Sequence, residues 1–520
     1  MERLSVSAFA SVLDLRSAKT GRATHSQPIL TRERALQTIA GLAAFGVPFA
    51  VYVYSMQRHV GYWDVGEMQT VPYIFGIAHP TGFPAFVVLG FLFSHALPLG
   101  TVAWRLTLLC ALAMSGAAYV AYRLIVDESG DAFIALPCAW LFAFGETAWT
   151  RGTRTEVHAL VTFFAAVTLY CMLRWSRTLE KRWLYAAAVA WALALATHPV
   201  AGLLGAGLFA LLLARWQDVS GASIARAVVL CAAIVGAFYA YLPLRSAQVS
   251  ALAVDPSLTL SLPPGQPFWD YDHPATRAGF VQLVTGSDFP VGDALAGIFL
   301  PQTYVARGHR YLDALRANLG ILGVVAAFLG ILSFLYVARW RAAGFLLSAF
   351  FAIPFALAYP IESDVGRYFL FSFFAIAVTI GVGFAAAVAR RPLLRAAAFA
   401  LVLALAAEQL YEHSSLLLQR FDSGATGFIS TVREKSPDGA IVISPWTYAT
   451  PLAYADYVEG TLGHRIVVVG WLSDHVGRVP AWMRKHPVVV VYQGGDPPPG
   501  YFLSLIASSD PPLYRVYRYK

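Results

Sequence analysis

Charged residues are scarce in this chain of 520 residues. Asp, Glu, Lys and Arg make up only 13% of it, against about a quarter in a typical soluble domain, whereas hydrophobic residues make up 58%. The shortage excludes a soluble protein of ordinary composition, and the long apolar runs predict a polytopic α-helical membrane protein. The net charge of +8 then indicates basic loops that set membrane orientation, not an affinity for nucleic acid.

Cysteine and signal-peptide features are also sparse. The chain has four cysteines, all inside apolar runs and none at metal-ligand spacing, so neither a disulfide framework nor a zinc site is predicted. Residues 1–35 are basic and rich in Ser and Thr, but they lack the apolar core of a signal peptide. They predict a mostly disordered cytoplasmic tail.

About 20 apolar residues are needed for a helix to cross a bilayer. Residues 184–214 are too long for one crossing, and Thr197-His198-Pro199 interrupts them, so they predict a pair of spans turning at His198. The run 83–97 is short and predicts a helix at the outer interface. About 11 transmembrane helices are predicted in all: 37–56, 103–124, 132–148, 156–173, 184–197, 200–214, 227–243, 317–337, 343–359, 367–389 and 393–411.

The parity of this count is tested by the basic loops. With a cytoplasmic N-terminus, nearly every short basic loop falls on the cytoplasmic side, as the positive-inside rule requires. The first outer loop (57–102), the segment 246–316 and the C-terminal part then lie outside. We interpret the chain as a bacterial inner (plasma) membrane protein with a periplasmic C-terminal domain.

The C-terminal part has a different pattern. Short β-branched runs at 440–444, 465–469 and 487–492 alternate with a predicted helix at 450–460, which favours a small α/β domain with a parallel sheet. The predicted organisation is a tail (1–35), a transmembrane domain (36–411) and an extracytoplasmic α/β domain (412–520).

Two carboxylates lie just past the first apolar run, in Tyr62-Trp63-Asp64-Val65-Gly66-Glu67. A carboxylate at a membrane edge suits a general base that takes a proton from a hydroxyl, so Asp64 and Glu67 are candidate catalytic residues. The competing interpretation is a solvated helix end whose aromatic residues belong to the interfacial belt. Spacing alone leaves both open.

Other polar residues share the predicted outer edge. An imidazole such as His79 could bind a phosphate oxygen or orient a base, and arginine matches phosphate geometry; turn formation and interfacial snorkelling are the structural alternatives. Glu362 and Asp364 are a weak alternative for a divalent cation; no cofactor is otherwise predicted. The candidate substrate-binding residues are His79, Arg154, Glu156, His198, Arg245 and Arg367.

Taken together, these residues resemble a known family. Asp64-x-Gly66-Glu67, His79-Pro80-x-Gly82-x-Pro84, Glu156-Val157-His158 and Tyr241-Leu-Pro-Leu-Arg245 look like the protein O-mannosyltransferase-like family, formerly a domain of unknown function, within the GT-C glycosyltransferase superfamily. The resemblance runs from about residue 37 to 390.

The resemblance implies an inverting transferase that uses a polyprenyl-phosphate sugar on the outer face. It places the catalytic carboxylate on Asp64 and supporting roles on Glu67 and His79, with a protein or glycolipid as acceptor. Two features depart from true O-mannosyltransferases: their acids are adjacent, and their trefoil-like outer domain is missing here. A transporter or flippase of lipid-linked intermediates is the alternative, although such proteins favour midplane charges and internal repeats.

Overall fold

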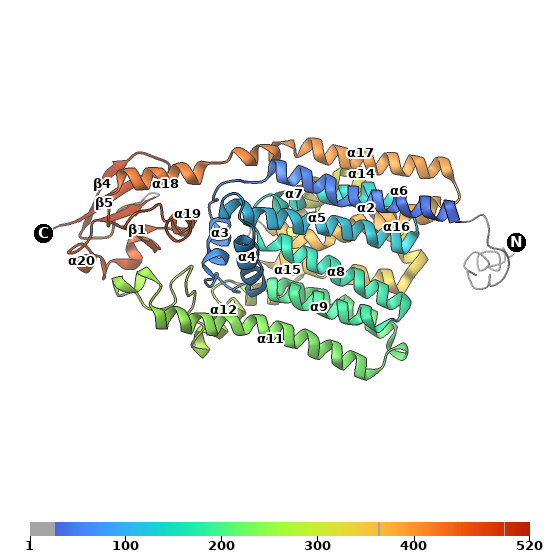
Figure 1. Cartoon of the computed structure of the whole chain (residues 1–520), viewed down its shortest axis with the longest axis horizontal. Helices are drawn as coiled ribbons and strands as arrows, with labels where there is room; N and C mark the ends of the chain where they lie inside the picture. Colours follow the sequence, from blue (N-terminus) through green and yellow to red (C-terminus); the bar gives the residue numbers. More distant parts are fainter. Residues whose placement is uncertain (1–26, 362–364, 493–494, 520) are drawn as a thin grey trace, which may run out of the picture.

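The computed structural model describes residues 27–361, 365–492 and 495–519. Long helices form one bundle, and a small sheet domain lies at one end of it, beyond helices α3 and α4 (Figure 1). The bundle helices are α2 (Gln27–Ser55), α5 (Val102–Ser129), α6 (Ala132–Phe144), α7 (Glu146–Gly152), α8 (Val157–Thr178), α9 (Lys181–Thr197), α10 (Gly205–Ala214), α11 (Gly221–Leu252), α14 (Pro301–Phe350), α15 (Ala352–Ala358), α16 (Leu370–Val388) and α17 (Pro392–Glu412).

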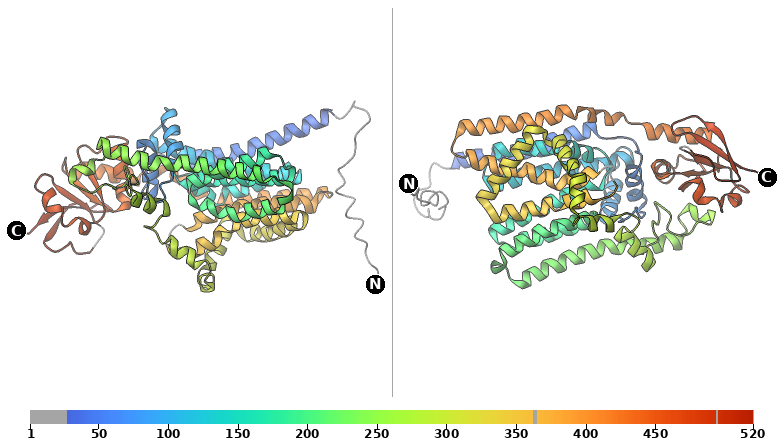
Figure 2. Two further views of the ribbon diagram at one scale, coloured as in Figure 1. Left: turned by 90° about the horizontal axis from the view of Figure 1, so that it is seen from below. Right: turned by 180° about the vertical axis from the view of Figure 1, so that it is seen from behind.

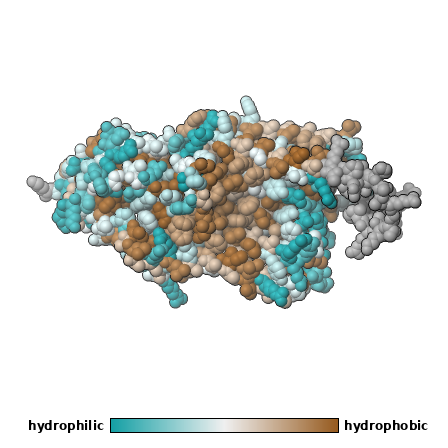
Figure 3. Space-filling model, in the orientation of Figure 1, coloured by the Kyte–Doolittle hydropathy of each residue, from teal (hydrophilic) through white to brown (hydrophobic). Residues whose placement is uncertain are grey.

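Membrane character follows from these helices. Within the described residues, seven helices are long and apolar enough to cross a membrane, or eight if the bent pair α6 and α7 forms one span. An apolar surface covers the middle of the molecule, and hydrophilic residues gather over the sheet domain (Figure 3). The predicted polytopic membrane protein is confirmed in this coarse form.

Several predicted spans take a different shape from the one expected. Helix α2 already begins at Gln27, inside the predicted tail, whereas residues 1–26 lie outside the described part. The predicted spans 317–337 and 343–359 fall largely in α14, whose backbone leaves helical geometry at Gly320 and Ala338. The predicted turn is present at His198, where α9 ends and a 3₁₀ helix, η1 (Pro199–Leu204), begins.

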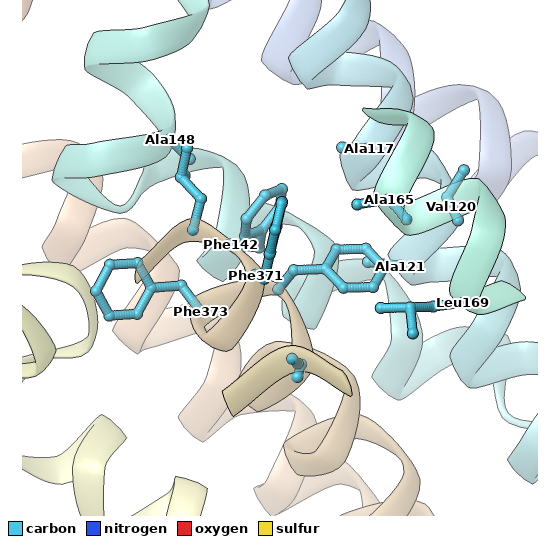
Figure 4. Close-up of a cluster of buried hydrophobic side chains, with 14 of the residues drawn as sticks. Ala117, Val120, Ala121, Phe142, Ala148, Ala165, Leu169, Phe371 and Phe373 are labelled. Carbon is cyan, nitrogen blue, oxygen red and sulfur yellow. The ribbon is translucent and has the colours of Figure 1, made fainter. Parts of the chain in front are cut away.

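Close backbone approach holds the bundle core together. A Cβ on Gly330 of α14 would lie 2.7 Å from the Cα of Ile380, and one on Gly383 of α16 would lie 2.6 Å from the carbonyl oxygen of Gly330. Small residues at such crossings allow tight packing between membrane helices. Figure 4 shows buried side chains of the core, with the ring of Phe371 beside Ala121 of α5 and Leu169 of α8.

Helices α3 (Asp64–Ile74) and α4 (Pro84–Ala96) run across the direction of the long helices, at the end of the bundle nearer the sheet (Figure 1). The predicted helix at 83–97 is present as α4, and its position at the outer interface stays a prediction. The outer segment after α11 carries α12 (Arg277–Thr285) and α13 (Val291–Gly297).

The C-terminal sheet has five strands in the order β2-β1-β3-β5-β4. Strands β1 (Ile441–Ser444), β2 (Ile466–Val469) and β3 (Val488–Val491) are parallel, but β5 (Leu513–Arg518) pairs antiparallel with both β3 and β4 (Tyr501–Ala507). The predicted all-parallel sheet is therefore wrong at its C-terminal edge, where a hairpin completes it. The sheet domain also contains helices α18 (Gly424–Lys435), α19 (Trp446–Tyr457) and α20 (Val479–Trp482). Both views of Figure 2 show this domain at the end of the molecule opposite the start of α2.

Candidate active site

The first turn of α3 carries both predicted carboxylates. Asp64 and Glu67 are its acidic residues, and negative charge is favourable at a helix N-terminus. Their environments differ sharply, because the Asp64 side chain is 39% exposed and that of Glu67 is fully buried. The two acids therefore serve different purposes.

Asp64 faces a cavity and is held by two groups from distant parts of the chain. The indole Nε1 of Trp446 in α19 donates to its Oδ1 at 3.0 Å. The Nη1 of Arg367 lies 3.9 Å from its Oδ2. These contacts fix the carboxylate while leaving part of it exposed.

Glu67 lies behind Asp64 and pairs with His79. Its Oε1 accepts the backbone N–H of His79 at 2.8 Å, and its Oε2 bonds the His79 Nδ1. Burial raises the pKa of Glu67, against the opposing effect of His79. Burial alone would lower the pKa of His79, but the carboxylates of Glu67 and Asp64 raise it to about 9. The two side chains are therefore tightly coupled, and the carboxylate of Glu67 holds the His79 ring in place.

A cavity of about 970 Å³ brings most of the predicted residues together. It lies between the bundle end, the outer segment and the sheet domain. Its lining includes six of the residues predicted from the sequence: Asp64, His79, Arg154, Glu156, His198 and Arg367.

Glu156 anchors a cluster of cations on the bundle side of this cavity. Its Oε2 accepts from Arg151 Nη1 at 2.8 Å and lies 3.8 Å from Arg154 Nη2, while His158 Nδ1 donates to its Oε1 at 2.8 Å. Burial raises the pKa of Glu156, but His158, Arg367 and Arg154 outweigh it and lower the pKa to about 2. Glu156 is thus an ionised anchor.

Arg245 is not brought into the cavity lining. It lies on α11, where its Nε donates to the carbonyl of Phe75 at 2.6 Å and its Nη2 to that of Ile74 at 3.3 Å. It satisfies carbonyls at the C-terminal end of α3, which is a structural contact and not a phosphate contact. The predicted grouping of Arg245 with the phosphate-binding residues therefore does not match its position.

Metal ligation was predicted only as a weak alternative at Glu362 and Asp364, which lie outside the described residues. Among the described residues, the ligand atoms of Asp64, Glu67 and His79 lie within 4.8 Å of one another. Both oxygens of Glu67 are already bonded to His79, and those of Asp64 face Trp446 and Arg367. A dication would have to displace these groups, so the arrangement does not favour a metal.

Sequence reasoning pointed to Tyr62 and Trp63, which line the cavity, but it missed the other aromatic residues of the lining. Trp446 and Trp471 come from the sheet domain, and Tyr271 and Phe289 come from the outer segment. Tyr359 and Tyr368 lie between α15 and α16. Trp446 follows the end of β1 and Trp471 the end of β2. Ligands of open α/β sheets bind at the carboxyl ends of parallel strands, and that rule would have pointed to both tryptophans.

Close packing explains why Gly66, between the two acids, is a glycine. A Cβ at this position would lie 2.6 Å from the carbonyl oxygen of Gly61 and 2.8 Å from Oγ1 of Thr450 in α19. The backbone N–H of Trp63 also donates to the carbonyl of Thr447 at 3.3 Å. Helix α3 is therefore the surface on which the sheet domain docks.

We expect Gly66→Ala to loosen this docking. Forcing a methyl group into a packed contact costs about 1–3 kcal/mol, which should raise protease cleavage of the sheet domain and hydrogen exchange in α19. Gly46→Ala in α2 is the matched control, because a Cβ there meets nothing within 4 Å. Equal protection of α19 in both variants would contradict the docking role.

The fold and the cavity define a class. The chain superposes on ArnT from Cupriavidus metallidurans, solved bound to undecaprenyl phosphate, with a TM-score of 0.59, 12% sequence identity, and coverage of 91% of this chain and 97% of ArnT. The chain therefore has the fold of ArnT, which is a GT-C glycosyltransferase.

Part of the chain matches a family model. Residues 64–221 match the model of the protein O-mannosyl-transferase TMEM260 N-terminal domain. This region begins at Asp64 and includes all the predicted catalytic and substrate-binding residues except Arg245 and Arg367. This chain is 31% identical over 122 residues to tmem260 of Dictyostelium discoideum and 30% identical over 133 residues to TMEM260 of Mus musculus.

The extent of these two matches is limited. They cover 23% and 26% of this chain, and only 15% and 19% of the curated relatives' own lengths. The predicted resemblance to O-mannosyltransferase-like and GT-C proteins is confirmed over the matched region.

Proposed function

We propose that this protein is an inverting membrane glycosyltransferase that moves a sugar from a polyprenyl-phosphate donor to a hydroxyl of a protein or glycolipid on the extracytoplasmic face. The observation that carries the proposal is the cavity in which a partly exposed carboxylate, Asp64, lies with two guanidinium groups, Arg154 and Arg367. A transferase of this kind needs a base for the acceptor and cations for the phosphate.

The reaction balances with these groups alone. Asp64 takes the proton of the acceptor hydroxyl as its oxygen attacks C1 of the sugar. The bond between C1 and the phosphate oxygen breaks, and the polyprenyl phosphate leaves with the electron pair. Attack from the face opposite the phosphate inverts the configuration at C1.

Arg154 and Arg367 are suited to the leaving phosphate. Guanidinium groups bind phosphate oxygens in fixed geometry, and preorganised positive charge stabilises the charge that develops on the leaving group. ArnT was solved with undecaprenyl phosphate bound, which supports a polyprenyl-phosphate donor here. The aromatic residues of the lining offer flat faces on which a sugar ring stacks.

The topology that accompanies this proposal has eleven crossings. It counts α9, the η1–α10 segment and the two parts of α14 as short or bent spans, and keeps α3 and α4 at the outer interface. The start of α2 and the sheet domain lie at opposite ends of the bundle (Figure 1), as an odd number of crossings requires. The proposed setting is a bacterial inner membrane, with the tail (1–35) cytoplasmic and 412–520 periplasmic.

The test is transfer by the full chain reconstituted in liposomes. Labelled undecaprenyl-phosphate mannose, chosen because the relatives are named O-mannosyl-transferases, and a panel of other undecaprenyl-phosphate hexoses are supplied with peptide or glycolipid acceptors. Label in the acceptor supports the proposal. Movement of the donor across the bilayer without transfer would overturn it in favour of a flippase.

Trp446→Phe should lower kcat about tenfold or more with little change in KM, because the carboxylate loses the donor that orients it. Phenylalanine keeps the ring that stacks on Phe268, at 5.6 Å between centroids. Trp482→Phe is the matched control, since it removes an indole donor to the carbonyl of Leu260 at 3.0 Å, outside the cavity lining. A similar loss in both variants would mean that Trp446 acts only through domain docking.

A further inference from the structure

Two histidines in the cavity wall are fixed in opposite tautomers. His158, near the start of α8, donates its Nδ1–H to Glu156 Oε1 at 2.8 Å, because an ionised carboxylate only accepts. His198, at the end of α9, accepts the backbone N–H of Val200 on its Nδ1 at 3.0 Å. In a neutral imidazole the other nitrogen takes the opposite role. His158 therefore presents an Nε2 acceptor and His198 an Nε2–H donor.

The two rings are neighbours in the same cavity. Their centroids are 4.9 Å apart, and both residues line it. His198 is held in place by stacking on Phe83 at 5.4 Å between centroids, with an interplanar angle of 21°. The pair is therefore positioned by four elements: the start of α8, the end of α9, the start of η1 and the turn before α4.

The Nε2 of His158 needs a partner. His158 is only 3% exposed, and within the described residues its Nε2 has no hydrogen-bond partner. An unsatisfied buried acceptor is costly, and no proposed step of the reaction uses this nitrogen. Arg154 and Arg367, which line the same cavity, disfavour a further positive charge, so both imidazoles are taken as neutral.

A hydroxyl group satisfies this pair and a phosphate does not. A hydroxyl both donates and accepts, so it can donate to His158 and accept from His198. An ionised phosphate oxygen has no proton for His158 and would face its lone pair. The phosphate is better matched by Arg154 and Arg367.

We propose that His158 and His198 form a subsite for one hydroxyl group of the transferred sugar. This inference rests on the proposed glycosyl transfer. The donor sugar is favoured over the acceptor because the two rings come from the bundle side, whereas the base Asp64 is held by Trp446 of the sheet domain. It assigns the site to a sugar with a free hydroxyl at one ring position, in preference to its deoxy form.

The experiment measures binding, which needs no turnover. It compares the removal of single hydroxyl groups from the donor with the removal of each imidazole from the protein. The full chain in detergent is titrated with undecaprenyl-phosphate mannose, with its 2-, 3-, 4- and 6-deoxy analogues, and with undecaprenyl phosphate alone. The readout is the fluorescence of tryptophans, three of which line the cavity: Trp63, Trp446 and Trp471. The proteins are wild type, His158→Phe, His198→Phe and the control His95→Phe, which lies outside this lining.

We expect one deoxy analogue to bind wild type and His95→Phe about tenfold or more weakly than the parent donor does. His158→Phe and His198→Phe should bind this analogue and the parent donor equally well. If His158→Phe does not fold, His198→Phe alone decides, because its ring keeps the stacking on Phe83. The proposal would be overturned if the deoxy analogues lost the same affinity in all four proteins. It would also be overturned if the His158→Phe and His198→Phe changes weakened the binding of undecaprenyl phosphate alone as much as that of the sugar donor.

Separate assays distinguish a hydroxyl of the donor sugar from a hydroxyl of the acceptor. They also distinguish the proposed subsite from the proposed glycosyl transfer. A transfer assay with deoxy acceptors shows whether the hydroxyl belongs to the acceptor, in which case only acceptor analogues would lose their penalty in the variants. Wild-type protein that binds sugar donors with the expected pattern but transfers none would refute the proposed function while retaining the subsite.

Discussion

Asp64→Asn is expected to abolish sugar transfer while leaving the protein folded and able to bind donor. Loss of a general base typically costs 10²- to 10⁴-fold in rate, and the loss here should fall near the upper end because Glu67 cannot replace Asp64: both its oxygens are bonded to His79. The measurement is kcat with reconstituted protein. The amide keeps the size of the side chain and its acceptor for Trp446.

The control for this variant is Asp438→Asn. Asp438 is an acid of the sheet domain whose Oδ2 lies 2.8 Å from His464 Nδ1, away from the cavity lining, and its replacement should leave kcat within about twofold, as for most surface changes. Donor affinity measured by tryptophan fluorescence should stay close to wild type in both variants. Retention of full activity by Asp64→Asn would remove Asp64 from the role of base.

Glu67→Ala is expected to produce the largest loss of stability. Removing one partner of a buried charged pair typically costs about 3–5 kcal/mol, since the remaining group loses its compensation. Here the remaining group is His79. Its backbone N–H and its Nδ1 both bond the Glu67 carboxylate, and both bonds are lost in the variant. Thermal unfolding can be followed with a thiol-reactive dye, because Cys110, Cys138 and Cys171 are buried.

The pH dependence identifies the cause of this loss. The pKa of His79 is raised from 6.5 to about 9, so the folded protein keeps a proton that the unfolded chain releases above its ordinary pKa. The stability from the pair is thus fully present below pH 6.5 and is lost as pH rises through about 9, by up to roughly 3 kcal/mol. Wild type should lose stability over this window and Glu67→Ala should not. Parallel curves would show that the loss reflects packing alone.

The fold could be predicted from the sequence where hydrophobicity carries the signal. Long apolar runs located the bundle helices, and the proline after His198 located the break between α9 and η1. Positions that depend on tertiary packing could not be read in this way. The antiparallel β4–β5 hairpin extends the parallel strands because of pairing partners that no local pattern specifies, and α14 runs through a basic stretch expected to be a loop.

The candidate site was predictable on one side only. Asp64, Glu67 and His79 lie within 16 residues of one another in a short, unusual motif, so their proximity could be inferred. Trp446 and Arg367 reach the same carboxylate from far along the chain, and no spacing rule links them to it. Arg245 shows the opposite case: an arginine predicted at the same membrane edge that lies outside the cavity lining and donates to carbonyls at the end of α3.

The contact between α3 and α19 also constrains the order in which the protein becomes complete. Asp64 is synthesised early, but the indole that holds it comes 382 residues later. One wall of the cavity, including Trp446 and Trp471, is thus absent until the last quarter of the chain has been made and folded. A ribosome-stalled or prematurely ended chain would display the acid without its partner and without the closed chamber around it. Incomplete copies would therefore lack both the indole that holds Asp64 and one wall of the cavity.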